Sequence, residues 1–373
     1  MKNGYYFFLC GYKETADEYT GILKKFEMQC NEFSKFFNIH FMTIYEKKHS
    51  SYIYKFTRRL FWNSADRNYN EIINLMNNPN FVYIRRTTAD KKLIDFLRKI
   101  KELWPACKII LEFYTFPYEK DEYKCLPGKF SLLKDRIYRK QYKKYVDRIV
   151  TFTSDVEIYG VKTIMSLNGV DTNAFGAITP RISDDEVHLL AVAMFQKHHG
   201  YERIIEGIHN YFSNGGTRVV KLFLVGEGPE INFYRELTNK FGLNSNVVFY
   251  GRQQGQALDD IYNQSDIGLG TFGFYKIGLD SASSLKTKEY LAKGIPVAAG
   301  CVEEFVNDEG RKYYLAFSND QSPVDINRLL QFYDSLYCGK LTKQMVADAI
   351  HEYAEKTVSM SVALKPIINF IGN

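Results

Sequence analysis

The sequence has few of the features that mark membrane-spanning, secreted or zinc-stabilised proteins. No apolar run approaches the roughly 18 residues that a transmembrane helix needs. The six cysteines are scattered without a C-x-x-C pair, which favours reduced thiols in a cytosolic protein and argues against structural zinc. The apolar stretch at 5–10 is short and leads into charged residues, so it indicates a first strand rather than a signal peptide. We therefore expect a cytoplasmic protein.

What the sequence does contain is typical of a globular protein with two domains. It has 373 residues, and one domain takes roughly 150. Apolar residues make up 45% and charged residues 25% of the chain, which excludes wholesale disorder. Aromatic residues are abundant at 16%, so the core should be rich in Tyr and Phe.

The net positive charge is confined to the first half of the chain. Residues 1–178 contain 30 Lys and Arg against 20 Asp and Glu, a net charge of +10, whereas residues 179–373 contain 19 against 23, a net charge of −4. A basic half indicates an anionic partner, which is a membrane surface, a phosphorylated substrate or nucleic acid. We expect no nucleic-acid partner, because no binding motif is present and the basic residues spread over many segments.

The second half alternates short apolar runs with helical patterns. Each run is too short for a buried helix and ends at Gly or a polar turn, so we expect buried parallel strands. The strands are expected at 188–194, 220–226, 246–250, 266–270 and 296–300, with helices at 201–212, 230–241 and 284–294. This alternation predicts a doubly wound α/β sheet.

The first half repeats the scheme less regularly. We expect strands at 5–11, 39–45, 81–86, 108–114, 148–154 and 163–168, with helices at 21–37 and 90–104. The turn-rich stretch 168–185 is the expected linker, and 341–357 has helical periodicity. The fold class is therefore α/β with two doubly wound, Rossmann-like domains, which bind ligands at the carboxyl ends of their strands.

Several motifs resemble those of one enzyme family. They are TIMSLNGVDTNAF at 163–175, VGEGPE at 225–230, the segment 247–270, and SLKTKEYLAKGIPVAAG at 284–300. In order and spacing they are similar to the family-4 glycosyltransferases, which have the GT-B fold. The segment LEFYTFPYEKDEY at 111–123 is similar to the E-x-T-Y-P-Y stretch of capsule and exopolysaccharide transferases.

This resemblance implies a retaining transferase that needs neither a metal ion nor a separate cofactor. Its substrate would be a nucleotide-sugar, most simply a UDP-sugar. The donor would lie mainly in a C-terminal domain, 178–352. The N-terminal domain would comprise residues 1–177 together with a returning helix at 353–373.

Glu289 is the strongest donor-site candidate. The family places the second glutamate of its E-x7-E motif here, and a carboxylate can accept hydrogen bonds from both ribose hydroxyls. The ordinary alternative is a solvated helix residue. The first glutamate of the motif falls at Ser281, so the pattern is broken, and Asp280 is the neighbouring carboxylate that would replace it.

The leaving diphosphate needs positive charge. The family usually supplies an Arg and a Lys after the first strand of the C-terminal domain, where this sequence has Met194 and His199. Lys197 is the candidate for the lysine role, and Lys286 is a second possible cation. His199 has a structural role as its ordinary alternative.

Backbone groups complete the expected donor site. Gly226 and Gly228 follow a strand and permit close approach of a ligand. The loop 272–284, including Gly278, and the helix start at Leu285 would offer N–H groups to an anion. By the resemblance, Arg252 contacts the base through its backbone, and Gly21 belongs to a loop that faces the donor phosphates.

The acceptor side is expected at the end of the strand 108–114. The resemblance implies Glu112, Thr115 and Tyr118, for which a packed aromatic loop is the ordinary alternative. The stretches 51–62 and 129–146 mix basic and aromatic residues, as an anionic membrane surface requires.

These observations favour a retaining glycosyltransferase at the inner face of a membrane, which transfers a sugar to a lipid-linked saccharide in surface polysaccharide assembly. The alternative is a GT-B partner or regulatory subunit without catalysis, suggested by Met194 and Ser281. A nucleotide-sugar epimerase would need acid and base groups across the cleft, for which the sequence offers no candidate.

Overall fold

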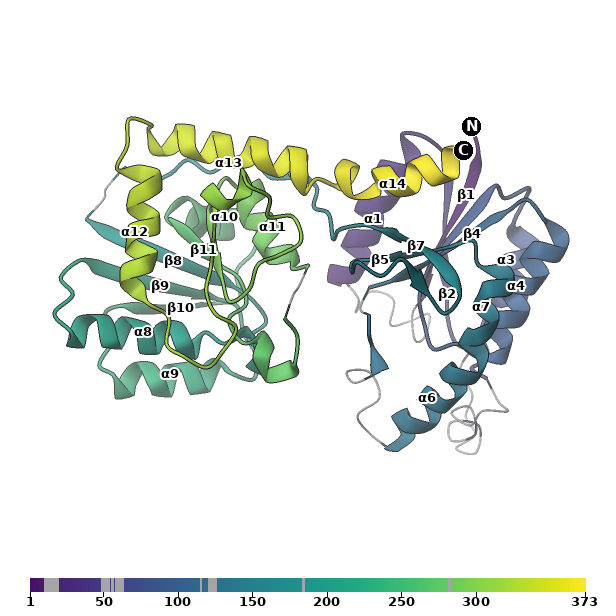
Figure 1. Ribbon diagram of the computed structural model, residues 1–373, viewed down its shortest axis with the longest axis horizontal. Coiled ribbons are helices and arrows are strands. Elements are labelled where there is room, and N and C mark those ends of the chain that lie inside the picture. Colours follow the sequence, from purple (N-terminus) through teal and green to yellow (C-terminus); the bar gives the residue numbers. More distant parts are fainter. Residues whose placement is uncertain are drawn as a thin grey trace. The chain divides into compact units, whose positions relative to one another are not determined.

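The computed structural model describes residues 1–9, 20–47, 54, 57, 64–114, 116–119, 126–182, 185–280 and 283–373. These residues form two compact units (Figure 1). The first comprises Met1–Leu167 with Ala363–Asn373, and the second comprises Asn168–Val362. The segment expected as a linker, 168–185, thus belongs to the second unit, and the chain returns to the first unit ten residues later than 353.

The first unit is built on a seven-stranded sheet with the order β2-β1-β3-β4-β5-β7-β6. Neighbouring strands are parallel except for β6 and β7. The strands are β1 Asn3–Leu9, β2 Asn38–Ile44, β3 Phe81–Arg85, β4 Lys108–Phe113, β5 Arg148–Thr151, β6 Glu157–Ile158 and β7 Val161–Met165. The helices are α1 Thr20–Ser34, α3 Tyr69–Leu75, α4 Lys91–Leu103, α6 Leu126–Tyr138, η2 Arg139–Gln141 and α7 Tyr142–Tyr145.

Aromatic side chains fill the layers of this unit. Tyr5, Tyr6, Phe7 and Phe8 of β1 are all buried, so both faces of this strand are covered. The ring of Tyr6 stacks on that of Tyr83 from β3, with centroids 4.9 Å apart. A central parallel strand between two helical layers needs apolar residues at every position rather than at alternate ones, which explains the continuous run YYFF.

The second unit has an all-parallel, six-stranded sheet with the order β10-β9-β8-β11-β12-β13. The strands are β8 Glu186–Val192, β9 Val219–Val225, β10 Val247–Gly251, β11 Ile267–Leu269, β12 Val297–Ala299 and β13 Tyr314–Ala316. The helices are η3 Thr172–Ala174, η4 Lys197–His199, α8 Glu202–Ser213, α9 Ile231–Lys240, α10 Gln256–Asn263, η5 Phe274–Ile277, α11 Leu285–Ala292, η6 Gly310–Lys312, α12 Ile326–Tyr337, α13 Lys343–Thr357 and α14 Met360–Gly372, whose end belongs to the first unit.

The order in which strands are added to this sheet reverses at β8. From β8 it proceeds to β9 and β10 on one side, and β11, β12 and β13 then continue on the other side. The connections after β8 and β11 therefore leave the sheet toward opposite faces. Such a topological switch point opens a crevice at the carboxyl ends of the strands, where doubly wound proteins bind ligands.

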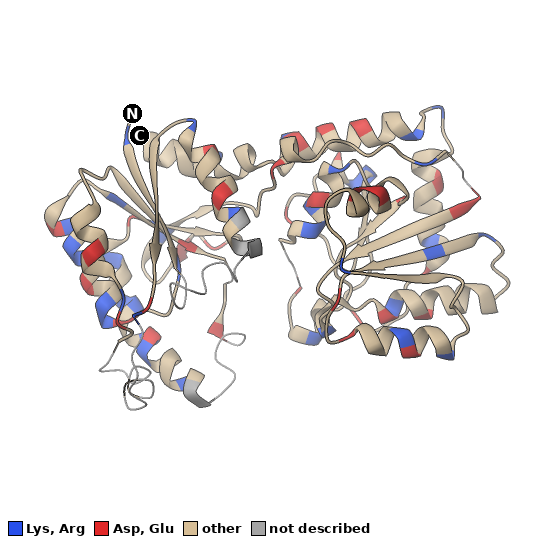
Figure 2. Cartoon of the chain, turned by 180° about the vertical axis from the view of Figure 1, so that it is seen from behind, with Lys and Arg blue, Asp and Glu red and all other residues tan. Residues whose placement is uncertain are grey.

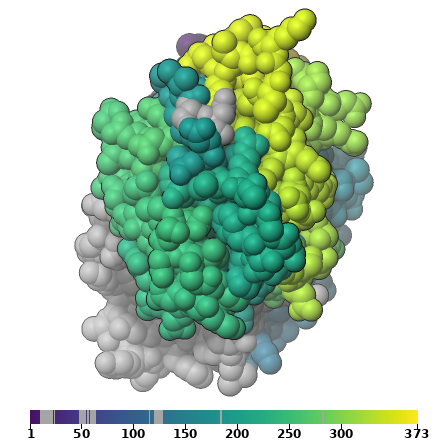
Figure 3. Space-filling model, turned by 90° about the vertical axis from the view of Figure 1, so that its left-hand side faces the viewer, coloured from purple at the N-terminus to yellow at the C-terminus, as the bar shows by residue number. Residues whose placement is uncertain are grey.

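The C-terminal helices cover parts of both units. In the space-filling view of Figure 3 the yellow C-terminal segment lies beside teal and green residues. The last turn of α14 is held in the first unit, where Lys2 Nζ donates to the carbonyl oxygens of Ile371 and Gly372, each at 2.7 Å, and Lys108 Nζ donates to that of Phe370 at 2.7 Å. Cations at a helix C-terminus satisfy its free carbonyls and interact favourably with the helix dipole. Among the described helices, none is long and apolar enough to cross a membrane.

Candidate active site

The glycine loop after β9 lies directly against the connection after β8. Gly226 has a φ of +128°, and a Cβ atom there would be 1.9 Å from the Ala193 carbonyl oxygen. Phe195 N–H donates to the Glu227 carbonyl at 2.9 Å. Gly228 has a φ of +155°, and a Cβ atom there would be 2.5 Å from the backbone nitrogen and carbonyl oxygen of Phe195. These two glycines are therefore required for backbone packing, whether or not a ligand also approaches them.

The connections after β8 and β11 meet at the switch point. Phe272 N–H donates to the His199 carbonyl at 2.8 Å, and a Cβ atom on Gly200 would lie 2.6 Å from Gly273 N. The two loops are thus joined through their backbones. They form one side of the crevice that the strand order predicts.

Lys286 of α11 contacts Tyr201, which follows the connection after β8. Its Nζ donates to Tyr201 Oη at 3.3 Å, and Tyr201 Oη donates in turn to the Leu269 carbonyl at 3.2 Å. Burial lowers the pKa of Lys286 to about 7, against the opposing influence of Glu303 and Glu289. A half-buried ammonium group in this position attracts an anionic ligand.

His199 lies on the other side of Tyr201, with its ring stacked on the tyrosine ring at 5.8 Å between centroids. Burial, followed by the charges of Lys286 and His198, lowers the pKa of His199 to about 2. Its Nδ1 accepts the Gln196 N–H at 3.0 Å, which places the ring proton on Nε2. His199 is therefore a neutral hydrogen-bond donor near neutral pH and supplies no positive charge.

The side chain of Lys197 is exposed to solvent. Its backbone carbonyl accepts a hydrogen bond from Lys276 Nζ at 3.1 Å. Met194, where the family usually has an arginine, is 69% exposed. Of the two lysines named from the sequence, Lys286 is thus half-buried and Lys197 is exposed.

The start of α11 is surrounded by buried charged groups. Glu303 is buried and accepts hydrogen bonds from Ser284 N–H at 2.9 Å and Thr287 Oγ1 at 3.0 Å. Burial raises the pKa of Glu303 to about 7. Lys288 is fully buried and forms an ion pair with Glu304 at 2.7 Å.

Glu289 is half-buried on the same helix. Lys288 is paired with Glu304, and Lys293 forms an ion pair with Asp259 at 2.6 Å, so two of the three neighbouring lysines are directed to other carboxylates. Lys286 and Glu289 are three residues apart on α11, and the Glu289 charge acts to raise the pKa of Lys286 against the effect of burial. Leu285, the first residue of α11, is half-buried, and Arg252 is exposed directly after β10.

The loop after η5 is fixed by Asn319. Tyr275 N–H donates to Asn319 Oδ1 at 2.9 Å, and Asn319 Nδ2 donates to the Leu279 carbonyl at 2.8 Å. Gly278 adopts the left-handed conformation with a φ of +71°. Asp280 is exposed, with its Oδ1 3.5 Å from Asn319 Nδ2. Ser281 lies outside the described residues.

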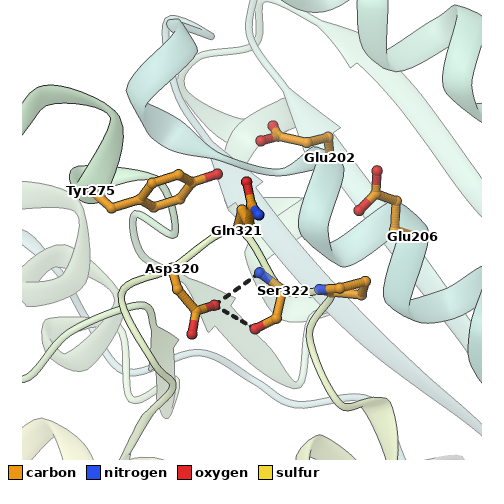
Figure 4. Close-up of a pocket in the computed structure, with 7 residues that line it drawn as sticks. Glu202, Glu206, Tyr275, Asp320, Gln321 and Ser322 are labelled. Atoms are coloured by element: carbon orange, nitrogen blue, oxygen red, sulfur yellow. Dashed lines mark hydrogen bonds between the residues drawn. The ribbon is translucent and has the colours of Figure 1, made fainter.

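A pocket of about 740 Å³ opens beside this loop (Figure 4). It is lined by Glu202, Glu206, Tyr275, Asp320, Gln321, Ser322 and Pro323. Its three carboxylates repel a diphosphate, so this pocket is an unsuitable place for the anionic part of a nucleotide-sugar. Within the described ranges, no group of three or more His, Cys, Asp or Glu side chains has the geometry of a metal site.

In the first unit, Glu112 lies in the interior of the protein. It is fully buried at the end of β4 and contacts Lys25 Nζ at 3.2 Å, Gln29 Nε2 at 3.2 Å and Tyr83 Oη at 2.6 Å. Burial acts to raise the pKa of Glu112, but Lys25, Tyr83 and Arg85 together bring it below its usual value. In this arrangement Glu112 anchors α1 to the sheet and has no exposed surface to offer to an acceptor.

Tyr118 is likewise buried, and its hydroxyl donates to Asp135 Oδ2 at 2.6 Å. Its ring is covered by the Arg86 guanidinium at 3.5 Å. Gly21 is the second residue of α1. Thr115 lies outside the described residues.

Comparison with known proteins agrees with this geometry. Residues 179–322 match the family model described as glycosyl transferases group 1. The matched segment lies within the second unit. The match covers the switch point, the loop 272–279 and α11, which are the parts of this unit that form the candidate donor site.

Solved structures similar to the whole chain have the GT-B fold. A glycosyltransferase from Rickettsia africae aligns at 12% identity with a TM-score of 0.59, covering 99% of this chain and 97% of that chain. Sucrose-phosphate synthase from Thermosynechococcus elongatus aligns at 11% with a TM-score of 0.61, covering 100% and 98%. Anabaena HepE in complex with UDP aligns at 11% with a TM-score of 0.59, covering all of both chains. No curated protein matches the sequence.

Sequence reasoning did not find Tyr201 or Glu303. Tyr201 is separated from Lys286 by 85 positions along the chain, and only the sheet order brings them together. For Glu303, the one local signal was its position just after a buried strand of the second unit, where polar residues reach the carboxyl edge.

Proposed function

We propose that this protein is a retaining, metal-independent glycosyltransferase that uses a UDP-sugar and acts on a lipid-linked saccharide in surface polysaccharide assembly. The donor would lie at the switch point of the second unit. The first unit would contact the acceptor and the inner face of the membrane.

One observation carries the donor half of this proposal: Lys286, near the start of α11, contacts Tyr201, and the half-buried Glu289 follows three residues later on the same helix. A cation and a carboxylate on neighbouring turns are what a nucleoside diphosphate requires, the first for the phosphates and the second for the ribose hydroxyls. Anabaena HepE, which shares the fold, was solved with UDP and with UDP-glucose.

The reaction follows from these roles. The bond between the sugar C1 and the diphosphate oxygen breaks, and the acceptor hydroxyl oxygen forms a bond to C1 from the same face. The acceptor proton passes to the departing phosphate oxygen. Lys286 stabilises the charge that collects on the diphosphate, while Glu289 holds the ribose and thereby orients the donor.

The charge distribution along the chain supports the part of the proposal that concerns the acceptor and the membrane. Residues 1–178 carry a net charge of +10, which suits a lipid diphosphate and the anionic surface in which such a lipid lies. Figure 2 shows that the Lys and Arg residues of this unit lie mainly on its helices.

Calorimetry with UDP tests the donor site. Glu289→Gln keeps the side-chain size but removes charge-assisted hydrogen bonds worth roughly 1.5–3 kcal/mol, so UDP affinity should fall about ten- to a hundredfold. The matched control is Glu236→Gln, at an exposed position of α9. 2′-Deoxy-UDP should bind the wild type weakly and respond little to Glu289→Gln. Equal UDP binding by the wild type and Glu289→Gln would remove Glu289 from the site.

A non-catalytic GT-B partner subunit is the second candidate. It is favoured by Met194, which is exposed and uncharged where the family usually has an arginine. Hydrolysis of UDP-sugars in the absence of acceptor separates the two functions. An enzyme releases UDP slowly from one donor, whereas a partner subunit leaves every donor intact.

A further inference from the structure

The outer face of α6 presents a continuous apolar stripe. Phe130, Leu133 and Ile137 are 44%, 49% and 44% exposed. Their spacing of three and four residues places them on one side of the helix. Among the described helices, no other has three exposed Leu, Ile, Val, Met or Phe side chains. Single exposed apolar residues are ordinary on a protein surface, whereas a stripe of them indicates a contact surface.

Basic side chains run beside this stripe. Lys129, Arg136 and Lys140 are exposed, and they lie three or four positions from Leu133 or Ile137. Arg136 is bonded to Glu119. Helical geometry then continues through η2 into α7, where Lys143 and Lys144 are also exposed. We call the stripe and its basic border, Phe130, Leu133, Ile137, Lys129 and Lys140, the α6 outer face.

The opposite side of α6 is fixed to the first unit. Asp135 is fully buried and accepts hydrogen bonds from Ala89 N–H at 2.7 Å and Tyr118 Oη at 2.6 Å. It also forms an ion pair with Arg139 at 3.2 Å. Because these contacts hold the inner side, the helix cannot rotate to bury its apolar stripe in its own unit.

We propose that the α6 outer face docks on an anionic lipid bilayer. An interfacial helix has this combination of apolar side chains bordered by lysines, whose chains bury their methylene groups and keep the ammonium group at the lipid phosphates. With 13 residues α6 is about 20 Å long, too short to span a bilayer core of about 30 Å, so it would lie along the surface. A neutral protein groove would accept the stripe but leave the lysines without a partner. The inference rests on the membrane half of the proposed function and not on sugar transfer.

Co-sedimentation with lipid vesicles tests the proposal. The whole chain should bind vesicles of equal parts phosphatidylglycerol and phosphatidylcholine at low salt, release as salt rises, and bind pure phosphatidylcholine weakly. Leu133→Asp should weaken binding about tenfold or more. The double substitution Lys129→Gln with Lys140→Gln should weaken it about fivefold for each lysine lost.

Matched substitutions on α4 distinguish the α6 outer face from general surface effects. Leu103, at the end of α4, is 51% exposed, so Leu103→Asp controls for Leu133→Asp. Lys91→Gln with Lys99→Gln controls for the loss of two exposed lysines. Equal weakening by α4 and α6 substitutions, equal binding to both vesicle types, or no binding at low salt would overturn the proposal. UDP binding measured on the same variants should not change, so failure of this proposal is separable from failure of the donor site.

Discussion

The charged ammonium group of Lys286 is expected to lower the folding stability of the protein when no anion is bound beside it. Its hydrogen-bond partner is the neutral hydroxyl of Tyr201, at 3.3 Å, and burial lowers its pKa to about 7. Residues held in such unfavourable positions often belong to binding sites, where a group that serves function lowers the stability of the folded protein.

Substitution of Lys286 separates its effect on ligand binding from its effect on folding stability. Lys286→Met should weaken UDP-glucose binding about ten- to a hundredfold through loss of a charged hydrogen bond, with little change for uridine, which has no phosphate. The same variant should gain roughly 0.5–2 kcal/mol in free energy of unfolding by urea. Lys197→Met, at an exposed position, is the comparison. A larger loss of UDP-glucose binding for Lys197→Met would transfer the role to that residue.

The affinity for UDP-glucose should also depend on pH. Lys286 loses its proton as pH rises through about 7, so binding should weaken above pH 7, by up to about tenfold per pH unit. Glu303, whose pKa burial raises to about 7, gains negative charge over the same range and acts in the same direction. His199, with a pKa of about 2, stays neutral throughout. Calorimetry between about pH 6 and about pH 9 should therefore give a shallower pH dependence of UDP-glucose affinity for Lys286→Met than for the wild type.

At the scale of elements, α8 holds the loops of the donor site in place through Arg203. This side chain is 1% exposed and donates to the carbonyl oxygens of Phe272 and Ser322, each at 2.6 Å, and of Ser318 at 3.1 Å. It thereby joins the connection after β11 to the segment before α12.

Arg203→Met should therefore destabilise the second unit. The substitution leaves the buried Phe272 carbonyl without its Arg203 donor, at a cost of about 1–3 kcal/mol, and also removes the part-buried bonds to Ser318 and Ser322, so we expect a loss of about 2 kcal/mol or more. Urea unfolding monitored by far-UV circular dichroism measures this loss in the free energy of unfolding. Arg98→Met, which removes a 51% exposed side chain of α4, should stay within about 0.5 kcal/mol. Similar losses for both variants would show that Arg203 has no special role.

The regular elements could be predicted because their signals are local. Each expected strand of the second half overlaps an observed one, since a buried parallel strand needs a continuous apolar run. The strand β13 was not predicted, because its three residues Tyr314–Ala316 are too few to give a pattern. The helix α12 was not predicted either, although Asp325 caps it by accepting the Arg328 N–H.

The candidate site could be predicted only in part. Glu289 and Lys286 could be named as candidates because both lie in one continuous motif on α11, and their donor role stays a prediction. The partner of Lys286 depends on how β8 and β11 are ordered in the sheet, which no local pattern specifies. The role of Glu112 depends on α1, whose Lys25 and Gln29 contact it from more than 80 positions away in the chain. A motif thus indicates which residues are present, while burial decides what each can contact.

At the scale of the whole molecule, each unit has a hydrophobic core of its own. The core of the first unit includes Ile84 of β3, which is 1% exposed, and one core of the second includes Leu222 of β9, which is fully buried. A chain built in this way need not unfold in a single step. The two units should respond separately to changes that affect only one of them.

Calorimetric unfolding with and without UDP tests where the donor binds. A ligand that binds only the folded second unit raises the melting temperature of that unit by mass action and leaves the first unchanged. Ile84→Ala and Leu222→Ala, each expected to cost about 2–5 kcal/mol, identify the two transitions, because each should lower only one. UDP should then raise the transition that Leu222→Ala lowers. If UDP raised the transition that Ile84→Ala lowers, the donor would lie in the first unit, and the roles of Lys286 and Glu289 would be wrong.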